Sequence, residues 1–560
     1  MDLFILLSRY IITSLAIVIF ILILGREKIE TKVNLPPHLL YNTMIIFFSL
    51  AMIIIGIKYF KDIKPLFINW LLITIMITTF YSLIKDKLEV RGSIIVFLII
   101  ISMIMLNRLD VYEARQQLMY LTISLMGAAI VYFLFPMITN KHMIKLYIPG
   151  LIILLLLPFL LGKRIYGAYN WVDLKFISFQ PSEIGKIAYG MIAGYLLTEK
   201  KIKKQSIWIV FFLTSIISII FVLQKDLGAA FLYMGVFLIL YYIHTLKLSH
   251  LIIGGLACGL SGIIFIATFS HVRKRILSWL DPFSDIWGAG YQMAQGLFAM
   301  GTWGPLGSGL ALGTPRSIPF VTTDFIFTAI VEELGVIIGC LIILSYFCIG
   351  MFGAVIATEL KNRFLQYIAI VYTSFITLQA FVILAGVLQI IPLTGVTLPF
   401  ISAGGSSILS STIMIVILFS LPIYDKKRKK AKRKVSVAQK GVKKIDTKPN
   451  PKASEKNSMT TQKDQKIQPN NTKSNPKVFA KNSMTTQKDQ KIQSNNTKPN
   501  SKTSIRNSIN TENINKIQPN NTKPNSKASI RNSANIENVK KIQPNNTKVN
   551  SKTSAKTKKE

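Results

Sequence analysis

Cysteine is scarce in this sequence: Cys258, Cys340 and Cys348 are the three among 560 residues. All three lie in apolar runs, and their spacing matches no metal-binding motif. We interpret them as small buried hydrophobic residues. The sequence therefore predicts neither a disulfide framework nor a zinc site.

Acidic residues are also few, with 26 Asp and Glu against 65 Lys and Arg, for a net charge of +39. Such an excess of positive charge can indicate a nucleic-acid-binding protein. The segment after Asp425 holds 35 basic and 7 acidic residues, so about +28 of the charge belongs to one polar tail. We therefore do not expect nucleic acid to be the main partner.

Charge is almost absent from long stretches between Leu3 and Leu421, where apolar runs near 20 residues recur. Each is long enough to cross about 30 Å of hydrocarbon as a helix. The runs do not alternate with period two, which excludes a β-barrel. The first run, Leu3 to Leu24, lacks a small-residue cleavage site, so we expect it to be a retained helix. The sequence predicts an all-α polytopic membrane protein.

We predict about thirteen transmembrane helices. They run over Leu3 to Leu24, Leu39 to Tyr59, Pro65 to Ile84, Gly92 to Asn107, Leu118 to Ile138, Ile144 to Leu161, Pro181 to Thr198, Ile207 to Leu223, Leu227 to Ile243, Leu251 to Ser270, Asp324 to Phe352, Gln366 to Ile391 and Gly404 to Tyr424. The basic block "KKRKKAKRK" after Tyr424 predicts a cytoplasmic C-terminus, because positive loops stay inside. An odd number of spans then leaves the N-terminus outside, together with residues 162–180, 224–226, 271–323 and 392–403.

The tail, residues 426–560, is rich in Lys, Asn, Ser, Thr and Gln and too polar to bury a core. "KIQPNNTK" begins at Lys466, Lys516 and Lys541, and "KIQSNNTK" at Lys491, which gives a period of 25 residues. These repeats have no hydrophobic face to stack, so we expect a disordered cytoplasmic array. Its positive charge favours anionic lipids of the inner leaflet. RNA or a partner protein is a weaker alternative.

Polar residues interrupt the apolar pattern in the outer segments. Trp171, Gln180, Ser182, Glu183 and Lys186 lie within "GAYNWVDLKFISFQPSEIGKIAYG". Pro181 and Ser182 begin a helix that places Glu183 and Lys186 on one face. Either the two form a local ion pair that lets them enter the membrane edge, or they belong to a functional site.

The outer loop His271 to Thr323 is the longest outside the tail, and loops of such length in compact proteins tend to be functional. It contains Arg273, Arg275, Asp281 and Gln292 in a glycine-rich context that lacks the "GK[ST]" of a P-loop. Arginines near a membrane surface usually contact lipid phosphates. The functional alternative is a bidentate clamp on a pyrophosphate.

The stretch "VTTDFIFTAIVEELG" places Asp324, Glu332 and Glu333 at the start and inside of a predicted span. A carboxylate at the membrane centre costs about 2.5 to 3.5 kcal/mol, so these acids need a compensating role. A helix cap is the alternative for Asp324, whereas we expect both glutamates to pair inside the bundle. Further on, "IPLTGVTLPFISAGGSSILSS", with Ser402 and Ser406, predicts non-helical backbone at the membrane face, which must be covered by protein or line a wet cavity.

With these motifs the sequence resembles the SEDS family of bacterial cell-wall proteins, the group of FtsW, RodA and SpoVE. The matching motifs are "GA..W" before "QPSE..K", "Q.DLG", "R.R....LDP......GYQ", "TDFIF..I.EELG" and "LPFIS.GGSS". The family core has ten spans, so the resemblance implies an N-terminal extension at 1–91, a core at 92–425 and the tail at 426–560. The chain departs from the usual pattern at Asn170, Lys225, Thr322 and Ala403.

The resemblance implies a peptidoglycan glycosyltransferase that polymerises lipid II outside the membrane beside a class B penicillin-binding protein and other divisome or elongasome proteins. It implies that Asp324 is the essential acid and Lys186 its salt-bridge partner, that Trp171 lines the cavity, and that Arg273 and Arg275 belong to the extracellular loop. The further substrate-binding residues that we predict are Gln180, Ser182, Glu183, Asp281, Gln292, Glu332, Ser402 and Ser406.

The chemistry of this reaction needs one base, because a polyprenyl pyrophosphate leaves without a proton. We predict that Asp324 takes the proton of the acceptor sugar's 4-hydroxyl while Arg273, Arg275 or a divalent cation, Mg²⁺ or Mn²⁺, neutralises the pyrophosphate. The sequence supplies no dedicated metal cage. We expect Lys186 to keep Asp324 ionised at rest. A lipid flippase or transporter and a non-catalytic scaffold for wall-synthesis enzymes are the alternatives.

Overall fold

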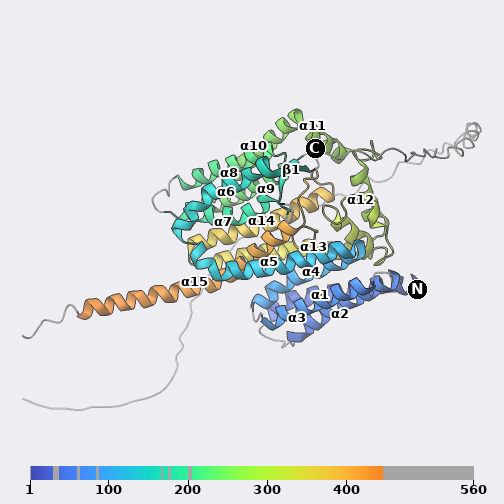
Figure 1. The fold of residues 1–560 in the computed structure, drawn as a ribbon, viewed down its shortest axis with the longest axis horizontal. Helices are drawn as coiled ribbons and strands as arrows, with labels where there is room; N and C mark the ends of the chain where they lie inside the picture. Colours follow the sequence, from blue (N-terminus) through green and yellow to red (C-terminus); the bar gives the residue numbers. More distant parts are fainter. Residues whose placement is uncertain are drawn as a thin grey trace, which may run out of the picture. The chain divides into compact units, whose positions relative to one another are not determined.

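The computed structural model describes residues 2–29, 37–59, 63–83, 87–165, 168–174, 178–199 and 205–445. The chain divides into two compact units, Met1–Glu455 and Lys456–Glu560, and every described residue belongs to the first. This unit consists of long helices with one small sheet (Figure 1).

The helices are α1 (Asp2–Ile29), α2 (Pro37–Lys58), α3 (Ile63–Leu83), α4 (Lys87–Leu109), α5 (Val111–Ile138), α6 (Lys141–Leu161), α7 (Pro181–Thr198), α8 (Ser206–Leu223), α9 (Leu227–Thr245), α10 (Leu248–Thr268), α11 (Ser270–Leu280), α12 (Tyr291–Thr302), α13 (Ile326–Glu359), α14 (Arg363–Val387) and α15 (Gly405–Ile445). A short 3₁₀ helix, η3, covers Pro315–Ser317.

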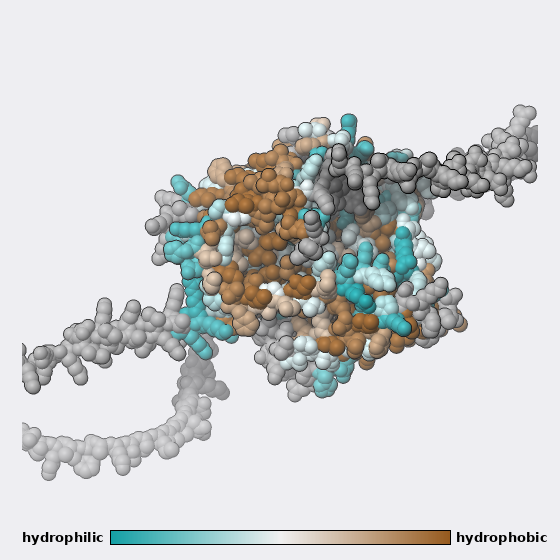
Figure 2. All heavy atoms as spheres, viewed as in Figure 1, coloured by the Kyte–Doolittle hydropathy of each residue, from teal (hydrophilic) through white to brown (hydrophobic). Residues whose placement is uncertain are grey.

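All thirteen predicted spans coincide with helices, namely α1 to α10 and α13 to α15. Eleven helices of the described part are long and apolar enough to cross a membrane, and this set leaves out α7 and α10. Helix α7 is buried among its neighbours over nearly its whole length, so it needs no lipid-facing apolar surface. The protein is an all-α polytopic membrane protein, and Figure 2 shows hydrophobic side chains gathered over the helices.

Helix α4 lies inside the bundle, since its span Arg91–Leu109 is buried throughout. It packs against α1 and α2 on one side and against α5 and α13 on another. The three helices of the predicted extension, α1 to α3, therefore cover α4, and α1 also packs against α13. Apolar contacts dominate this interface, with Phe20 of α1 against Phe97 of α4 at 6.2 Å between ring centroids.

One buried polar contact joins the extension to the rest of the bundle. Asn69 of α3 is fully buried and donates through Nδ2 to Asn107 Oδ1 of α4 at 2.7 Å and to Val111 O at 3.2 Å. A buried amide that loses its partner costs about 1 to 3 kcal/mol.

We therefore expect Asn69→Leu to lower the free energy of unfolding by about 1 to 3 kcal/mol, because Asn107 Oδ1 would stay buried without this donor. Thermal unfolding of the purified protein in detergent checks this. Ile68→Leu is the control, since Ile68 is 44% exposed on the same helix. Equal stability of the two variants would contradict the prediction.

The segment Gly162 to Gln180 is not the simple loop that the sequence predicts. It contains the strands β1 (Gly162–Ile165), β2 (Ala168–Asp173) and β3 (Ser178–Phe179), which form one antiparallel sheet in the order β1-β2-β3. Residues 166–167 and 175–177 lie outside the described residues. Likewise, the predicted loop 271–323 contains α11, α12 and η3.

Helix α13 is broken at Gly335, where φ is +91°. The preceding loop fills the break: Ser308 N donates to Glu332 O at 2.8 Å, Gly309 N to Glu333 O at 3.1 Å and Ile337 N to Pro305 O at 3.2 Å. A Cβ on Gly335 would lie 2.2 Å from Pro305 O, so the contact requires glycine. Protein groups thus satisfy the opened backbone inside the membrane.

Helix α15 extends into the predicted tail. We expected disorder from residue 426, but the helix runs on to Ile445. The membrane-embedded part supplies the costly nucleus, and the Lys, Arg and Ala residues that follow propagate a helix readily. Residues 446–560, with the 25-residue repeats, lie outside the described residues.

The interpretation of the cysteines as buried hydrophobic residues is correct for Cys348 and wrong for Cys340, which is exposed. Cys340 lies on the membrane-spanning helix α13, where an apolar side chain can face lipid instead of protein. The side chain of Cys258 lies outside the described part of the chain.

Candidate active site

Asp324 lies in the turn that leads into α13, two residues before the helix begins at Ile326. The N-cap residue is Phe325, which makes no side-chain cap hydrogen bond. Asp324 is therefore not the N-cap residue of α13. Its side chain is half-buried. Burial raises the pKa of the Asp324 carboxyl from 3.8 to about 6, while the positive charge of Arg275 and the Thr323 hydroxyl act in the opposite direction.

Arg275 of α11 is close enough to this carboxylate for its positive charge to lower the pKa of the carboxyl group. Its Nη1 donates to Leu393 O at 3.2 Å and to Thr394 O at 3.0 Å, which ties α11 to the loop before α15. A Cβ on Gly395 would lie 3.5 Å from Arg275 Nη2 and 3.8 Å from Asp324 Oδ2, so this loop closes the site from a third side. Arg275 and Arg273, two residues earlier, are both exposed.

The loop between α14 and α15 is also bound to the turn that carries Asp324. Ser402 Oγ donates to Thr323 O at 2.6 Å and accepts from Leu398 N at 2.9 Å. Ala403 N donates to Thr322 O at 2.9 Å. Two departures from the family pattern, Thr322 and Ala403, are therefore neighbours. Ser402 is a buried internal contact.

Lys186 does not pair with Asp324, so that prediction is wrong. Its Nζ lies 2.6 Å from Glu183 Oε1 and donates to Gln379 Oε1 at 2.6 Å. Both partners are buried, and the second oxygen of Glu183 accepts from Ser410 at 2.7 Å. The local ion pair is the correct alternative, because a lysine at i+3 reaches its own helix neighbour before a residue on another helix.

Asp226, which the sequence reasoning did not select, bonds two side chains of the sheet region, Asn170 and Gln180. Asp226 Oδ2 accepts from Gln180 Nε2 at 2.9 Å and from Asn170 Nδ2 at 3.0 Å, and its Oδ1 caps α9 through Ala229 N at 3.0 Å. The signal was present in the motif "Q.DLG". Trp171 lies half-buried in β2, paired with the backbone of β1.

Four further predicted site residues either bond to the protein's own backbone or are buried. Asp281 Oδ1 accepts from Phe283 N at 3.0 Å and Ser284 N at 3.2 Å, which stabilises the turn after α11. Gln292 Nε2 donates to Pro319 O at 3.2 Å. Ser182 and Ser406 are buried at the starts of α7 and α15.

The two glutamates of α13 take partners inside the bundle, but not each other. Glu333 Oε1 lies 2.8 Å from Arg108 Nη2, and its Oε2 accepts from Ala311 N at 3.0 Å. Glu332 Oε1 accepts from Thr314 N at 2.7 Å. Arg108 was missed by the sequence reasoning, although an arginine that ends an apolar run is a signal for a buried charge pair.

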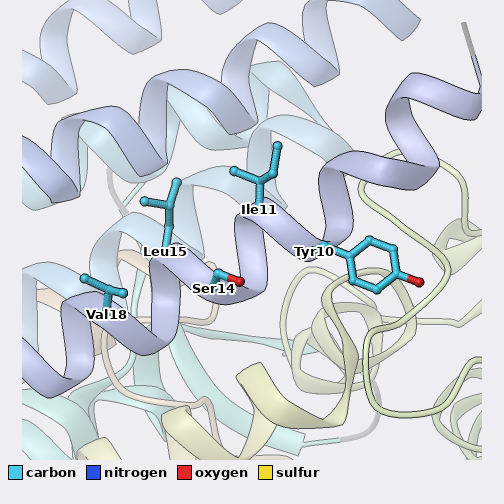
Figure 3. Close-up of a pocket in the computed structure, with 5 residues that line it drawn as sticks. All are labelled: Tyr10, Ile11, Ser14, Leu15 and Val18. Carbon is cyan, nitrogen blue, oxygen red and sulfur yellow. The ribbon is translucent and has the colours of Figure 1, made fainter.

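The described residues contain no group of three or more His, Cys, Asp and Glu side chains that could hold a metal ion. The donor set therefore does not fit a protein-made cage for Mg²⁺ or Mn²⁺, and we assign no step to a metal. An apolar groove on α1, lined by Tyr10, Ile11, Ser14, Leu15 and Val18, contains none of the predicted site residues (Figure 3).

Asp324, Arg275 and the loop around Gly395 thus form a polar junction at the entrance to α13. A half-buried carboxylate with a pKa near 6 can accept a proton at neutral pH, and the adjacent guanidinium can stabilise an anion. The fold is that of a polytopic helical membrane protein in which Asp324 and Arg275 come together where α13 begins. The chain belongs to the family of cell cycle proteins FtsW, RodA and SpoVE, whose family model matches residues 88–427.

Relatives with curated names support the same family. The chain is 31% identical over 351 residues to peptidoglycan glycosyltransferase RodA of Mycobacterium tuberculosis (strain ATCC 25618 / H37Rv), covering 57% of this chain and 74% of that relative. It is 32% identical over 287 residues to stage V sporulation protein E of Bacillus subtilis (strain 168), covering 49% and 77%.

A solved structure described as structural coordination of polymerization and crosslinking by a peptidoglycan synthase complex has a similar fold. The TM-score is 0.50 at 22% sequence identity, and the match covers 59% of this chain and 96% of that chain. At this identity the likeness concerns the fold alone.

Proposed function

We propose that the protein is a peptidoglycan glycosyltransferase that polymerises lipid II, with Asp324 as the general base. The observation that carries this proposal is the half-buried Asp324 carboxylate, with a pKa of about 6, beside Arg275. The curated names of relatives of this chain, peptidoglycan glycosyltransferase among them, support the reaction class.

In the proposed reaction Asp324 removes the proton from the 4-hydroxyl of the acceptor sugar, whose oxygen then attacks the anomeric carbon of the donor. The bond between that carbon and the pyrophosphate oxygen breaks, and the pyrophosphate leaves without a proton. Arg275, and Arg273 on the same helix, stabilise the negative charge of the leaving group. Trp171 is our remaining candidate for direct contact with substrate.

The other predicted residues act through position rather than contact in this proposal. Lys186 and Glu183 neutralise each other inside the bundle, at a distance of 2.6 Å. Gln180, Ser182, Asp281, Gln292, Glu332, Ser402 and Ser406 shape the site through the internal contacts or buried positions described above. Lys186→Met is therefore expected to impair folding as well as catalysis.

We further propose three regions: an extension at 1–91, the catalytic core at 92–425 and the tail at 426–560. The match of the family model from residue 88 supports the first boundary. The protein resides in the cytoplasmic membrane with several spans, and we propose that its N-terminus lies outside and its basic tail in the cytoplasm, where anionic lipids attract Lys and Arg.

A class B penicillin-binding protein is the proposed partner, within a divisome or elongasome assembly. The similar fold in a peptidoglycan synthase complex supports this choice. The proposed reaction is the same in cell division, elongation or sporulation.

Purified protein in liposomes with lipid II tests the proposed reaction. We expect glycan ladders on a gel, with more product when a class B penicillin-binding protein is added. Movement of labelled lipid II between leaflets without ladders would instead support a transporter. Loss of ladders on removal of residues 435–560 would contradict a catalytic core that is independent of the tail.

The polymerisation rate should have an acidic limb with an apparent pKa near 6. Below this pH Asp324 is protonated and cannot act as a base, so the rate should fall about tenfold per pH unit; above it the carboxylate is ionised and the rate should be level. Initial rates between pH 5 and 8 measure the limb. Residual activity of Asp324→Asn should show no such limb, and persistence of the limb in that variant would assign it to another group.

A further inference from the structure

A chain of buried and half-buried hydrogen bonds joins α7, α14 and α15 to the loop that contacts Arg275. It begins in α7, where Lys186 Nζ lies 2.6 Å from Glu183 Oε1. The same Nζ donates to Gln379 Oε1 of α14 at 2.6 Å. Gln379 is only 1% exposed, although it lies in the middle of a membrane-spanning helix. A polar amide in that place needs partners on both of its ends.

The amide nitrogen of Gln379 bonds to Thr397, which lies in the loop before α15. It donates to Thr397 O at 2.8 Å and lies 3.3 Å from Thr397 Oγ1. Thr397 Oγ1 donates to Ser407 Oγ at 2.7 Å, and Ser410 Oγ returns to α7 by donating to Glu183 Oε2 at 2.7 Å. Ser410 Oγ also lies 3.1 Å from Ser407 O, so Ser410 links Glu183 of α7 to the residue that Thr397 contacts.

The same loop is bound at its other end to the proposed catalytic centre. Leu393 O and Thr394 O accept from Arg275, and Gly395, with φ at +76°, lies between Arg275 and Asp324. Only Val396 therefore separates Gly395, which faces Asp324, from Thr397, which Gln379 holds. Because the segment is so short, we expect a displacement of Thr397 to move Leu393 and Thr394, which bind Arg275.

We propose that Gln379 and Thr397 are positioning residues, which fix the loop 393–397 so that Arg275 stays beside the Asp324 carboxylate. This inference rests on the proposed function of Asp324 as the base. Gln379 is suited to the role because its oxygen is held by a buried ammonium and its nitrogen by the loop, so neither end can turn without leaving a buried group unpaired.

Arg275 is the charged side chain that acts on the Asp324 carboxyl in the described part of the chain. Arg316, on the preceding loop, donates to Leu109 O at 3.0 Å instead. The two glutamates that follow on α13 are bonded to Arg108, Ala311 and Thr314 as described above, and the loop 388–404 contains no charged residue. A shift of Arg275 should therefore be visible in the titration of Asp324.

The test uses the full-length protein with Gln379→Leu and, separately, Thr397→Val, reconstituted in liposomes with lipid II. We expect kcat to fall roughly 10- to 100-fold with KM little changed, because a displacement near 1 Å at a reacting centre has effects of this size. The acidic limb should move to higher pH, since Arg275 lowers the pKa of Asp324. Thr397→Ser keeps the hydroxyl and should restore both values.

Gln366→Leu is the matched control, since Gln366 lies on the same helix and donates to Leu360 O at 2.6 Å in the turn that joins α13 to α14. It should leave kcat and the acidic limb as in the wild type. A fall in kcat of Gln379→Leu and Thr397→Val without movement of the limb would reduce the two residues to a structural role and overturn the proposal.

Infrared difference spectroscopy provides a readout that does not depend on activity. The carboxyl band assigned to Asp324, by its loss in Asp324→Asn, should titrate at higher pH in Gln379→Leu than in the wild type. Identical titration overturns the positioning role even where glycan ladders form. Absence of ladders from the wild type would overturn the proposed function, while a shifted titration would still support the tether between Gln379 and Arg275.

Discussion

Asp324→Asn is expected to lower the rate of lipid II polymerisation by roughly 10²- to 10⁴-fold, the usual contribution of a positioned general base. The amide has nearly the shape of the carboxylate but cannot take the proton of the acceptor hydroxyl. The fold should persist, because burial already raises the pKa of this group to about 6 and an uncharged side chain suits the site. Initial rates in liposomes with lipid II measure the loss.

Asp285→Asn is the matched control for this variant. Asp285 is an exposed acid of the same outer segment, where its carboxylate accepts from Ala289 N at 2.8 Å. It should retain the wild-type rate within about twofold, which corresponds to less than 0.5 kcal/mol. A wild-type rate in Asp324→Asn would show that another group removes the proton.

Arg108→Leu is expected to reduce the free energy of unfolding by about 3 to 5 kcal/mol. Glu333 is fully buried, and its Oε1 lies 2.8 Å from Arg108 Nη2, so the variant would leave an uncompensated charge inside the bundle. Arg108 also donates to Gly313 O at 3.0 Å, which helps to hold the loop that fills the break in α13. Thermal unfolding in detergent and the monodisperse fraction on gel filtration measure the effect.

The double variant Arg108→Leu with Glu333→Leu separates the charge from the packing. It removes both charges together, so it should recover part of the stability that either single variant loses. Arg363→Leu, at an exposed arginine that begins α14, should change the unfolding free energy by less than about 0.5 kcal/mol. Strictly additive losses in the double variant would contradict a coupled buried pair.

The contrast between Lys186 and Asp324 illustrates where the sequence reasoning failed. Both residues interrupt apolar segments, and the resemblance to the family implied that they form a salt bridge. In the structure Lys186 instead contacts Glu183 and Gln379. The charge that acts on Asp324 is that of Arg275. Partners of this kind depend on which helix faces meet, and one sequence contains no information on the rotation of one helix against another.

Other polar residues gave a usable signal that was not followed. Asn69, Arg108 and Gln379 each lie within or at the end of an apolar run, where a polar side chain is costly without a partner. The cost predicts that a partner exists, but not its identity. The helical continuation of α15 to Ile445 was also accessible, because Lys, Arg and Ala favour a helix that is already nucleated.

The sequence by itself determined the class of protein and the places of its membrane helices, because a segment of about 20 apolar residues satisfies its own backbone and needs no distant partner to be recognised. It also singled out Asp324 as an acidic residue at the start of a membrane helix. Only the tertiary structure decided what faces Asp324, where the glutamates of α13 find their partners and how the loop around Gly395 is held. These depend on contacts between residues far apart in the chain, since a charge in a medium of low dielectric is stabilised by whichever group the packing brings within about 4 Å.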